Sequence, residues 1–253
     1  MYASKAAGAA QKSMNSAMEK LSSGMRINNA KDDAAGQGIA TRLTAEITSL
    51  NMASRNASDA QAMIDTAEAA HQEVHAILLR MREIAVQASN GTLSQSDRTA
   101  LDAEVTALET EITSIADNTA FAGIKLGQGV SVAFQIGTAN GNVLNHNFVD
   151  FDVSSIGANI AVNSVSTATA ALATVDNAIS VVSANRGTLG ALSNRLSSTI
   201  ANLDNISVNL SSARGRIQDT DFAQETSNLA KSQIMQQAAT AMLAQANASK
   251  GSI

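Results

Sequence analysis

The stretch VDNAISVVSANRGTLGALSNRLSSTIANLDNISVNL, residues 175–210, carries an apolar residue at every seventh position. The series continues to residue 217 without a gap, and its members are Val175, Val182, Leu189, Leu196, Leu203, Leu210 and Ile217. Seven residues make almost two turns of an α-helix, so these side chains form one narrow stripe along the helix. The stretch therefore predicts a long helix, from about residue 167 to 210, that packs in a coiled coil.

Two further stretches predict helices that can pack against this stripe. From Leu43 to Ala88, apolar residues recur at steps of three and four, and Asn90-Gly91 ends the pattern. The next helix begins where Ser94 and Asp97 have the spacing of a capping box. The chain contains no proline, so none of these helices is broken by one. We expect the three helices to wrap into one elongated antiparallel bundle.

Residues 126–166 follow a different pattern. The segments VSVAFQIG and NVLNHNFVDFDVS alternate in places between apolar and polar residues, and Asn140-Gly141 lies between them. Asn-Gly between two β-like segments is typical of a hairpin turn. The predicted fold class is therefore mainly α, an elongated antiparallel coiled-coil rod with a small β-rich hairpin lobe at one end.

The two ends of the chain are predicted to lie together, because the long helices that precede and follow them are antiparallel. The segment LSSGMRINNAKDDAAGQGIATRL, residues 21–43, then faces SSARGRIQDTD, residues 211–221. The longer segment must bulge or fold back, which its glycines permit. We expect opposite charges to fix the register of this joint, each exposed pair contributing about 0–1 kcal/mol. The charged residues expected near one another are Arg26, Lys31, Asp32 and Asp33 on one side and Arg214, Arg216, Asp219 and Asp221 on the other.

Composition excludes several classes of function. A net charge of −5 provides no basic surface for nucleic acid, and the absence of cysteine excludes disulfides and thiolate metal sites. No apolar run approaches the length that spans a membrane, and no hydrophobic signal segment opens the chain. Only 2% of the residues are aromatic, which fits helices that pack through small aliphatic side chains.

Patterns that carry chemistry are incomplete. Residues 30–40, AKDDAAGQGIA, lack the glycine spacing and the following Lys-Ser/Thr of a phosphate-binding loop. Glu68, His71 and His75 have the spacing of one helix face, but the remaining histidine, His146, falls in the β-rich lobe. No arrangement of His with Ser, Cys or Asp suits nucleophilic catalysis. We expect no catalytic residue, no cofactor and no metal, and the chain is predicted not to be an enzyme.

Several segments, taken in order, resemble bacterial flagellin. They are MEKLSSGMRINNAKDDAAGQGIA, ASRNASDAQAMIDTAEAA and LLRMREIAVQASNGTLSQSDRTALDAEV in the first half, and LGALSNRLSSTIANL, SARGRIQDTDFAQE and QIMQQAATAMLAQAN in the second. Together they cover the chain except for roughly residues 127–169. The resemblance implies a structural subunit that is secreted and polymerises into the helical filament of the bacterial flagellum for motility.

The resemblance also implies a domain organisation. Residues 1–20 and 222–253 correspond to terminal helices of an inner tube, and residues 21–43 and 211–221 to a connecting spoke. Residues 44–125 and 167–210 correspond to a helical rod, and residues 126–166 to a surface-exposed variable lobe. The chain is similar to a short flagellin without large outer domains. Because it starts abruptly and lacks a Leu-rich tail, we expect it to be trimmed at both termini.

The partners implied are other flagellin subunits, the flagellar export apparatus and its chaperone, and the hook-associated and cap proteins, with no nucleic acid and no membrane insertion. Arg80, Ile84 and Glu104 match the patch through which flagellins engage the vertebrate flagellin-sensing Toll-like receptor, and Ile84 stands where Leu is common.

Two alternatives remain open from the sequence. One is the related hook–filament junction protein, whose counterpart of DDAAGQ usually carries a proline that is absent here. The other is a surface-displayed adhesin that binds glycans through the lobe, with Phe134, Phe148 and Phe151 available for stacking.

Overall fold

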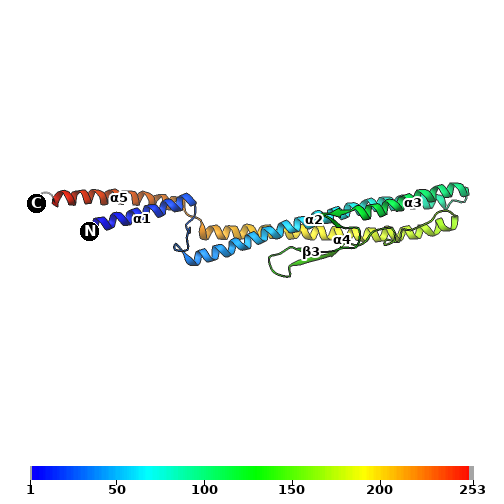
Figure 1. Cartoon of the computed structure of the whole chain (residues 1–253), viewed down its shortest axis with the longest axis horizontal. Helices are drawn as coiled ribbons and strands as arrows, with labels where there is room; N and C mark the ends of the chain where they lie inside the picture. Colours follow the sequence, from blue (N-terminus) through cyan, green and yellow to red (C-terminus); the bar gives the residue numbers. More distant parts are fainter. Residues whose placement is uncertain (1, 251–253) are drawn as a thin grey trace. The chain divides into compact units, whose positions relative to one another are not determined.

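The computed structural model describes residues 2–250, without the side chains of residue 3 and residues 247–250, and is mainly α-helical (Figure 1). Within these residues the helices are α1 (Tyr2–Ser23), α2 (Ala34–Ala88), α3 (Gln95–Asn118), α4 (Val165–Gln218) and α5 (Phe222–Lys250). The strands are β1 (Ala120–Phe121), β2 (Ile124–Lys125), β3 (Ser131–Gln135) and β4 (Val143–Asn147). The predicted fold class, mainly α with a small β hairpin lobe, is confirmed.

The chain divides into two compact units. One is Met1–Thr48 with Ile206–Ile253, and the other is Ser49–Asn205. The helices α2 and α4 each contribute residues to both units.

In the unit Ser49–Asn205, the helices α2, α3 and α4 pack around the heptad stripe (Figure 1). Val175, Val182 and Leu196 of the stripe are fully buried. Helix α2 ends at Ala88, and α3 begins with a complete capping box between Ser94 and Asp97, as predicted from their spacing. The stripe therefore forms the centre of this unit.

The hairpin of β3 and β4 covers part of α2 and α4 that α3 does not reach. The strands pair antiparallel with Phe134 opposite Leu144, and Leu144 packs in one apolar cluster with Ala60 and Leu196. This cluster contains no residue of α3. The lobe therefore lies along the side of the helix pair, where the apolar face of the hairpin takes the place of the third helix, and does not cap the end of the bundle.

In the other unit, α1 and α5 lie side by side (Figure 1). The buried apolar side chains on these two helices, as far as the structure describes them, are Ala10, Ala17 and Ala239. Ser232 and Glu225 are also buried there. An alanine core allows close approach of the helices but buries little apolar area.

Helix α4 contains an 18-residue window whose length and mean hydropathy of 1.3 would suffice to cross a membrane. The window reaches this mean hydropathy without being a continuous apolar run, which is why the sequence predicted no membrane span. The helix has few charges, and its apolar stripe is buried against neighbouring helices. A helix at the centre of a helical bundle meets the same criterion as a membrane span.

Candidate functional site

The two connecting segments meet through their main chains. Met25 and Asp219 form an antiparallel bridge, and the backbone N–H of Arg26 donates to the carbonyl of Gln218 at 2.7 Å. The Arg26 guanidinium donates to the carbonyl of Ile217 at 2.6 Å. Gly24, at φ 72°, lies in the left-handed region that glycine adopts without strain. These bonds fix the register of the joint.

The carboxylates of the joint serve local turns. Asp32 accepts hydrogen bonds from two backbone N–H groups of the preceding turn, and Asp33 accepts from the N–H of Gly36 at 2.8 Å. Asp221 accepts from two N–H groups in the first turn of α5. Carboxylates at such positions satisfy N–H groups that lack a partner within the helix.

The expected charge pairing across the joint differs from the structure. Arg214 donates to the Thr44 hydroxyl at 3.4 Å, and Arg216 to Ser212 on its own helix. Among residues 2–250, no ion pair joins the two groups of charged residues, and Lys31 has no polar partner. The sequence pattern located the joint, but Asp32, Asp33 and Asp221 already accept hydrogen bonds from backbone N–H groups. Leu210 and Ile217, the last residues of the heptad stripe, are half-buried here.

The predicted receptor patch is only partly exposed. Arg80 pairs with Glu104 at 2.8 Å and with Glu83 at 3.0 Å. Ile84 is completely buried between α2 and its neighbours, in the same apolar cluster as Val105. The side chain of Ile84 therefore stabilises the core and is not presented to a partner.

A polar layer interrupts the apolar packing along α2 and α4. Arg186 pairs with Glu68 at 2.7 Å, and next to Glu68 the ring of His71, only 3% exposed, lies 4.4 Å from the ring of Phe151. Burial lowers the pKa of His71 to about 4, with opposing charge effects of Glu68, which raises it, and Arg186, which lowers it. His71 is therefore neutral near pH 7.

Two buried nitrogens of this region have no hydrogen-bond partner among the described residues, namely Nδ1 of His71 and Nδ2 of Asn185. Glu68, His71 and His75 share one helix face, but Glu68 is paired with Arg186. The three side chains therefore do not point to one common site. In the described part of the chain, no three His, Cys, Asp or Glu side chains are grouped to hold a metal ion.

A second polar feature fastens the segment before α4 to α3. Asp102 accepts the backbone N–H of Val162, and Glu109, seven residues further along α3, accepts that of Ile160, both at 2.7 Å. Burial raises the pKa of Glu109. This contact was not predicted from the sequence, although the spacing of seven residues between the two carboxylates places both on one face of α3.

The aromatic side chains of the lobe are used in packing. Phe148 and Phe151 are buried, and Phe134 packs against the apolar cluster that contains Leu144 and Leu196. Stacking of a glycan on these rings would require the lobe to open, so the geometry does not favour the adhesin alternative.

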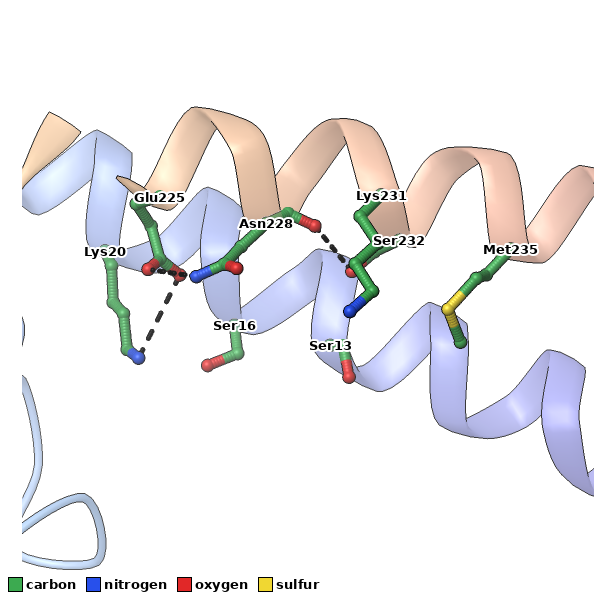
Figure 2. Close-up of a pocket in the computed structure, with 8 residues that line it drawn as sticks. All are labelled: Ser13, Ser16, Lys20, Glu225, Asn228, Lys231, Ser232 and Met235. Atoms are coloured by element: carbon green, nitrogen blue, oxygen red, sulfur yellow. Dashed lines mark hydrogen bonds and ion pairs between the residues drawn. The ribbon is translucent and has the colours of Figure 1, made fainter. Parts of the chain in front are cut away.

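A polar groove of about 410 Å³ runs between α1 and α5 (Figure 2). Glu225, on the first turn of α5, accepts a hydrogen bond from Asn228 at 3.1 Å and lies 3.9 Å from the ammonium group of Lys20. Ser13, Ser16 and Lys231 also line the groove.

Comparison with known proteins identifies relatives over almost the whole chain. The families described as bacterial flagellin N-terminal helical region and bacterial flagellin C-terminal helical region match residues 1–131 and 172–253. The flagellin of Halalkalibacterium halodurans is 43% identical over 236 residues, which cover 91% of this chain and 87% of that protein. The flagellin of Bacillus subtilis is 40% identical over 267 residues, covering 91% and 88%.

A solved structure agrees with these matches. The crystal structure of Bacillus cereus flagellin is 31% identical to this chain and aligns with a TM-score of 0.55, covering 59% of this chain and 88% of that one. The heptad stripe, the joint and the terminal helices lie within or directly beside the matched regions. The chain belongs to the bacterial flagellin family, the structural subunits of the extracellular flagellar filament.

Proposed function

We propose that this chain assembles into the filament by packing α1 and α5 against the same helices of other copies, and that its role is structural and not catalytic. One observation carries this proposal. The helix pair has an alanine core, while large apolar side chains on α5 face solvent, with Ile234 66% and Met242 67% exposed. Met18 of α1 and Met235 of α5 are each 47% exposed. Helices of this kind gain stability when further helices cover them.

The two units would then have different tasks. Residues 1–20 and 222–253 would form the inner tube, and residues 21–43 with 211–221 the spoke. Residues 44–125 and 167–210 would form the rod, with residues 126–166 on its outer side. The unit Ser49–Asn205 supports this division because it has large apolar clusters of its own.

We propose further protein partners from the same exposed surfaces. In a single copy the apolar side chains of α5 are uncovered, so the export apparatus and its chaperone would hold this region before assembly. The hook-associated and cap proteins would meet it at the ends of the filament. A vertebrate flagellin-sensing Toll-like receptor would reach Arg80 and Glu104 but not Ile84.

Electron microscopy of the polymerised chain tests the proposal. The wild-type chain should form smooth tubular filaments, and Ile234→Asp should abolish them, because a charge would be buried between subunits. Gln237→Asp, at an exposed polar position of the same helix, is the matched control and should polymerise. Filaments formed equally well by Ile234→Asp, with helix content unchanged by circular dichroism, would contradict assembly through α5.

A further inference from the structure

Two Asn-Gly pairs occur in the chain, Asn90-Gly91 after the end of α2 and Asn140-Gly141 at the tip of the β3–β4 hairpin. Both asparagines are exposed to solvent. In such a pair the backbone nitrogen of the glycine can attack the side-chain carbonyl carbon of the asparagine, because glycine has no Cβ that hinders the approach. The two pairs carry the same reacting groups, so the structure around each pair decides which one reacts.

Asn90 is held at its carbonyl and at its side chain. The carbonyl accepts from the backbone N–H of Leu93 at 3.4 Å and from the guanidinium of Arg98 at 2.9 Å. The side-chain Oδ1 accepts from the backbone N–H of Thr92 at 3.2 Å. Attack by the Gly91 nitrogen requires the side chain to leave Thr92 and the backbone to rotate. These hydrogen bonds therefore oppose the reaction.

Asn140 lacks these restraints. Its backbone N–H, its carbonyl and its side-chain amide make no hydrogen bond to residues 2–250, and the N–H of Gly141 makes none either. The turn is closed by the neighbouring residues, where the N–H of Asn142 donates to the carbonyl of Ala139 at 3.2 Å. The nitrogen of Gly141 and the side chain of Asn140 can therefore approach each other without loss of a hydrogen bond of their own.

We propose that Asn140 is a site of spontaneous deamidation, by which the uncharged tip of the hairpin becomes acidic with time, and that Asn90 is protected from the same reaction. The nitrogen of Gly141 bonds to Cγ of Asn140, and the side-chain amide leaves as ammonia, which produces a five-membered succinimide ring. Water then opens the ring at either carbonyl, which yields aspartate or isoaspartate. The net reaction consumes one water and releases one ammonium ion.

The product changes the lobe in two ways. Residues 127–185 contain no lysine or arginine, so the new carboxylate has no cation within this segment to pair with. In isoaspartate the main chain passes through the side-chain methylene group, which lengthens the turn that Ala139 and Asn142 close. The reaction takes place within one chain and does not depend on assembly.

Incubation in ¹⁸O-labelled water measures the reaction at each pair. The full chain is kept at neutral pH and then digested in ordinary water, so that ¹⁸O in a new carboxylate marks deamidation that preceded the digestion. We expect mass spectrometry to show that the peptide with Asn140 acquires ¹⁸O about ten-fold faster than the peptide with Asn90, which corresponds to about 1.4 kcal/mol of additional barrier at Asn90. Equal rates, or a faster reaction at Asn90, would overturn the proposal.

Two comparisons test whether the hydrogen bonds protect Asn90. In the urea-unfolded chain both pairs should react at similar rates, and a difference of about ten-fold that persists in urea would refute the protection. Arg98→Gln removes a donor to the Asn90 carbonyl and should accelerate the reaction at Asn90 while leaving Asn140 unchanged. An unchanged rate at Asn90, with wild-type helix content by circular dichroism, would contradict protection by this contact. The comparison in urea holds whether or not this variant folds.

Discussion

The carboxylate of Glu109 accepts the backbone N–H of Ile160 at 2.7 Å, and so a helix side chain supplies the hydrogen bond that a neighbouring strand would supply in a sheet. With Asp102 bonded to Val162 in the same way, α3 holds a segment that belongs to none of the described helices and strands. The segment brings Val162 into the apolar cluster that contains Ile84 and Val105.

Removal of this acceptor should destabilise the unit Ser49–Asn205. Glu109→Ala leaves a half-buried N–H unpaired and should lower the free energy of unfolding by about 1–3 kcal/mol, measured by urea denaturation. Glu109→Gln retains an acceptor oxygen and should lose less. Glu111→Ala, an exposed position of the same helix, is the control and should stay within about 0.5 kcal/mol of wild type. A loss for Glu109→Ala no larger than that control would show that the hydrogen bond does not stabilise the segment.

Acid should weaken the fold through His71. The unfolded chain binds a proton at this imidazole below about pH 6.5, whereas the folded chain binds it only below about pH 4. The free energy of unfolding should therefore fall as the pH decreases from 6.5 to 4, by roughly 3 kcal/mol from this group. Urea titrations at a series of pH values measure the slope.

The variant His71→Gln should flatten this slope without removing it, because burial also lowers the pKa of His146. Gln72→Ala, at an exposed position of the same helix that carries no ionisable group, is the control and should keep the wild-type slope. If His71→Gln keeps it too, the acid sensitivity arises elsewhere.

The start of α3 should depend on its capping box. Ser94→Ala removes the side-chain acceptor for the N–H of Asp97 and should cost about 0.5–2 kcal/mol. Ser94→Asn, which retains an acceptor of similar reach, should recover most of this loss. Thermal denaturation followed by circular dichroism compares the two variants, and an unchanged midpoint for Ser94→Ala would refute a role of the cap in stability.

The stability of the joint should depend on its backbone conformation and not on the charges of its side chains. Gly24→Ala forces a residue with a Cβ into the left-handed region and should lower stability by about 1–2 kcal/mol. Lys31→Gln removes a cation that pairs with nothing in the described chain, and should stay within about 0.5 kcal/mol of wild type. Proteolysis at residues 21–33 is the local readout. Faster cleavage of Lys31→Gln than of Gly24→Ala would indicate that charge pairing controls the joint after all.

Local patterns in the sequence were sufficient for the helices. The heptad from Val175 to Leu203 predicted both a long helix and its buried stripe, and the pair Ser94 and Asp97 predicted the start of α3. Both signals depend on spacing along one helix, so they can be read without knowledge of the partner elements.

Contacts between distant segments could not be predicted in the same way. Ile84 lies on a helix that packs on two sides, so its position in the sequence does not reveal whether it is a surface residue or a core residue. Asp32 and Asp33 are charged residues of the kind that form ion pairs. Their carboxylate oxygens, however, accept hydrogen bonds from nearby backbone N–H groups. The side on which the hairpin packs depends on where α3 ends relative to α2, which spacing within either helix does not determine.

The polar layer of Glu68, His71, Asn185 and Arg186 has a consequence for how α2 and α4 can align. A slide of either helix by one turn would separate the ion pair of Glu68 and Arg186, whose side chains are partly buried, and would move the ring of His71 away from the ring of Phe151. A uniformly apolar stripe would not impose such a penalty. The repeated heptads alone would tolerate several alignments of the two long helices, and this single layer selects one of them.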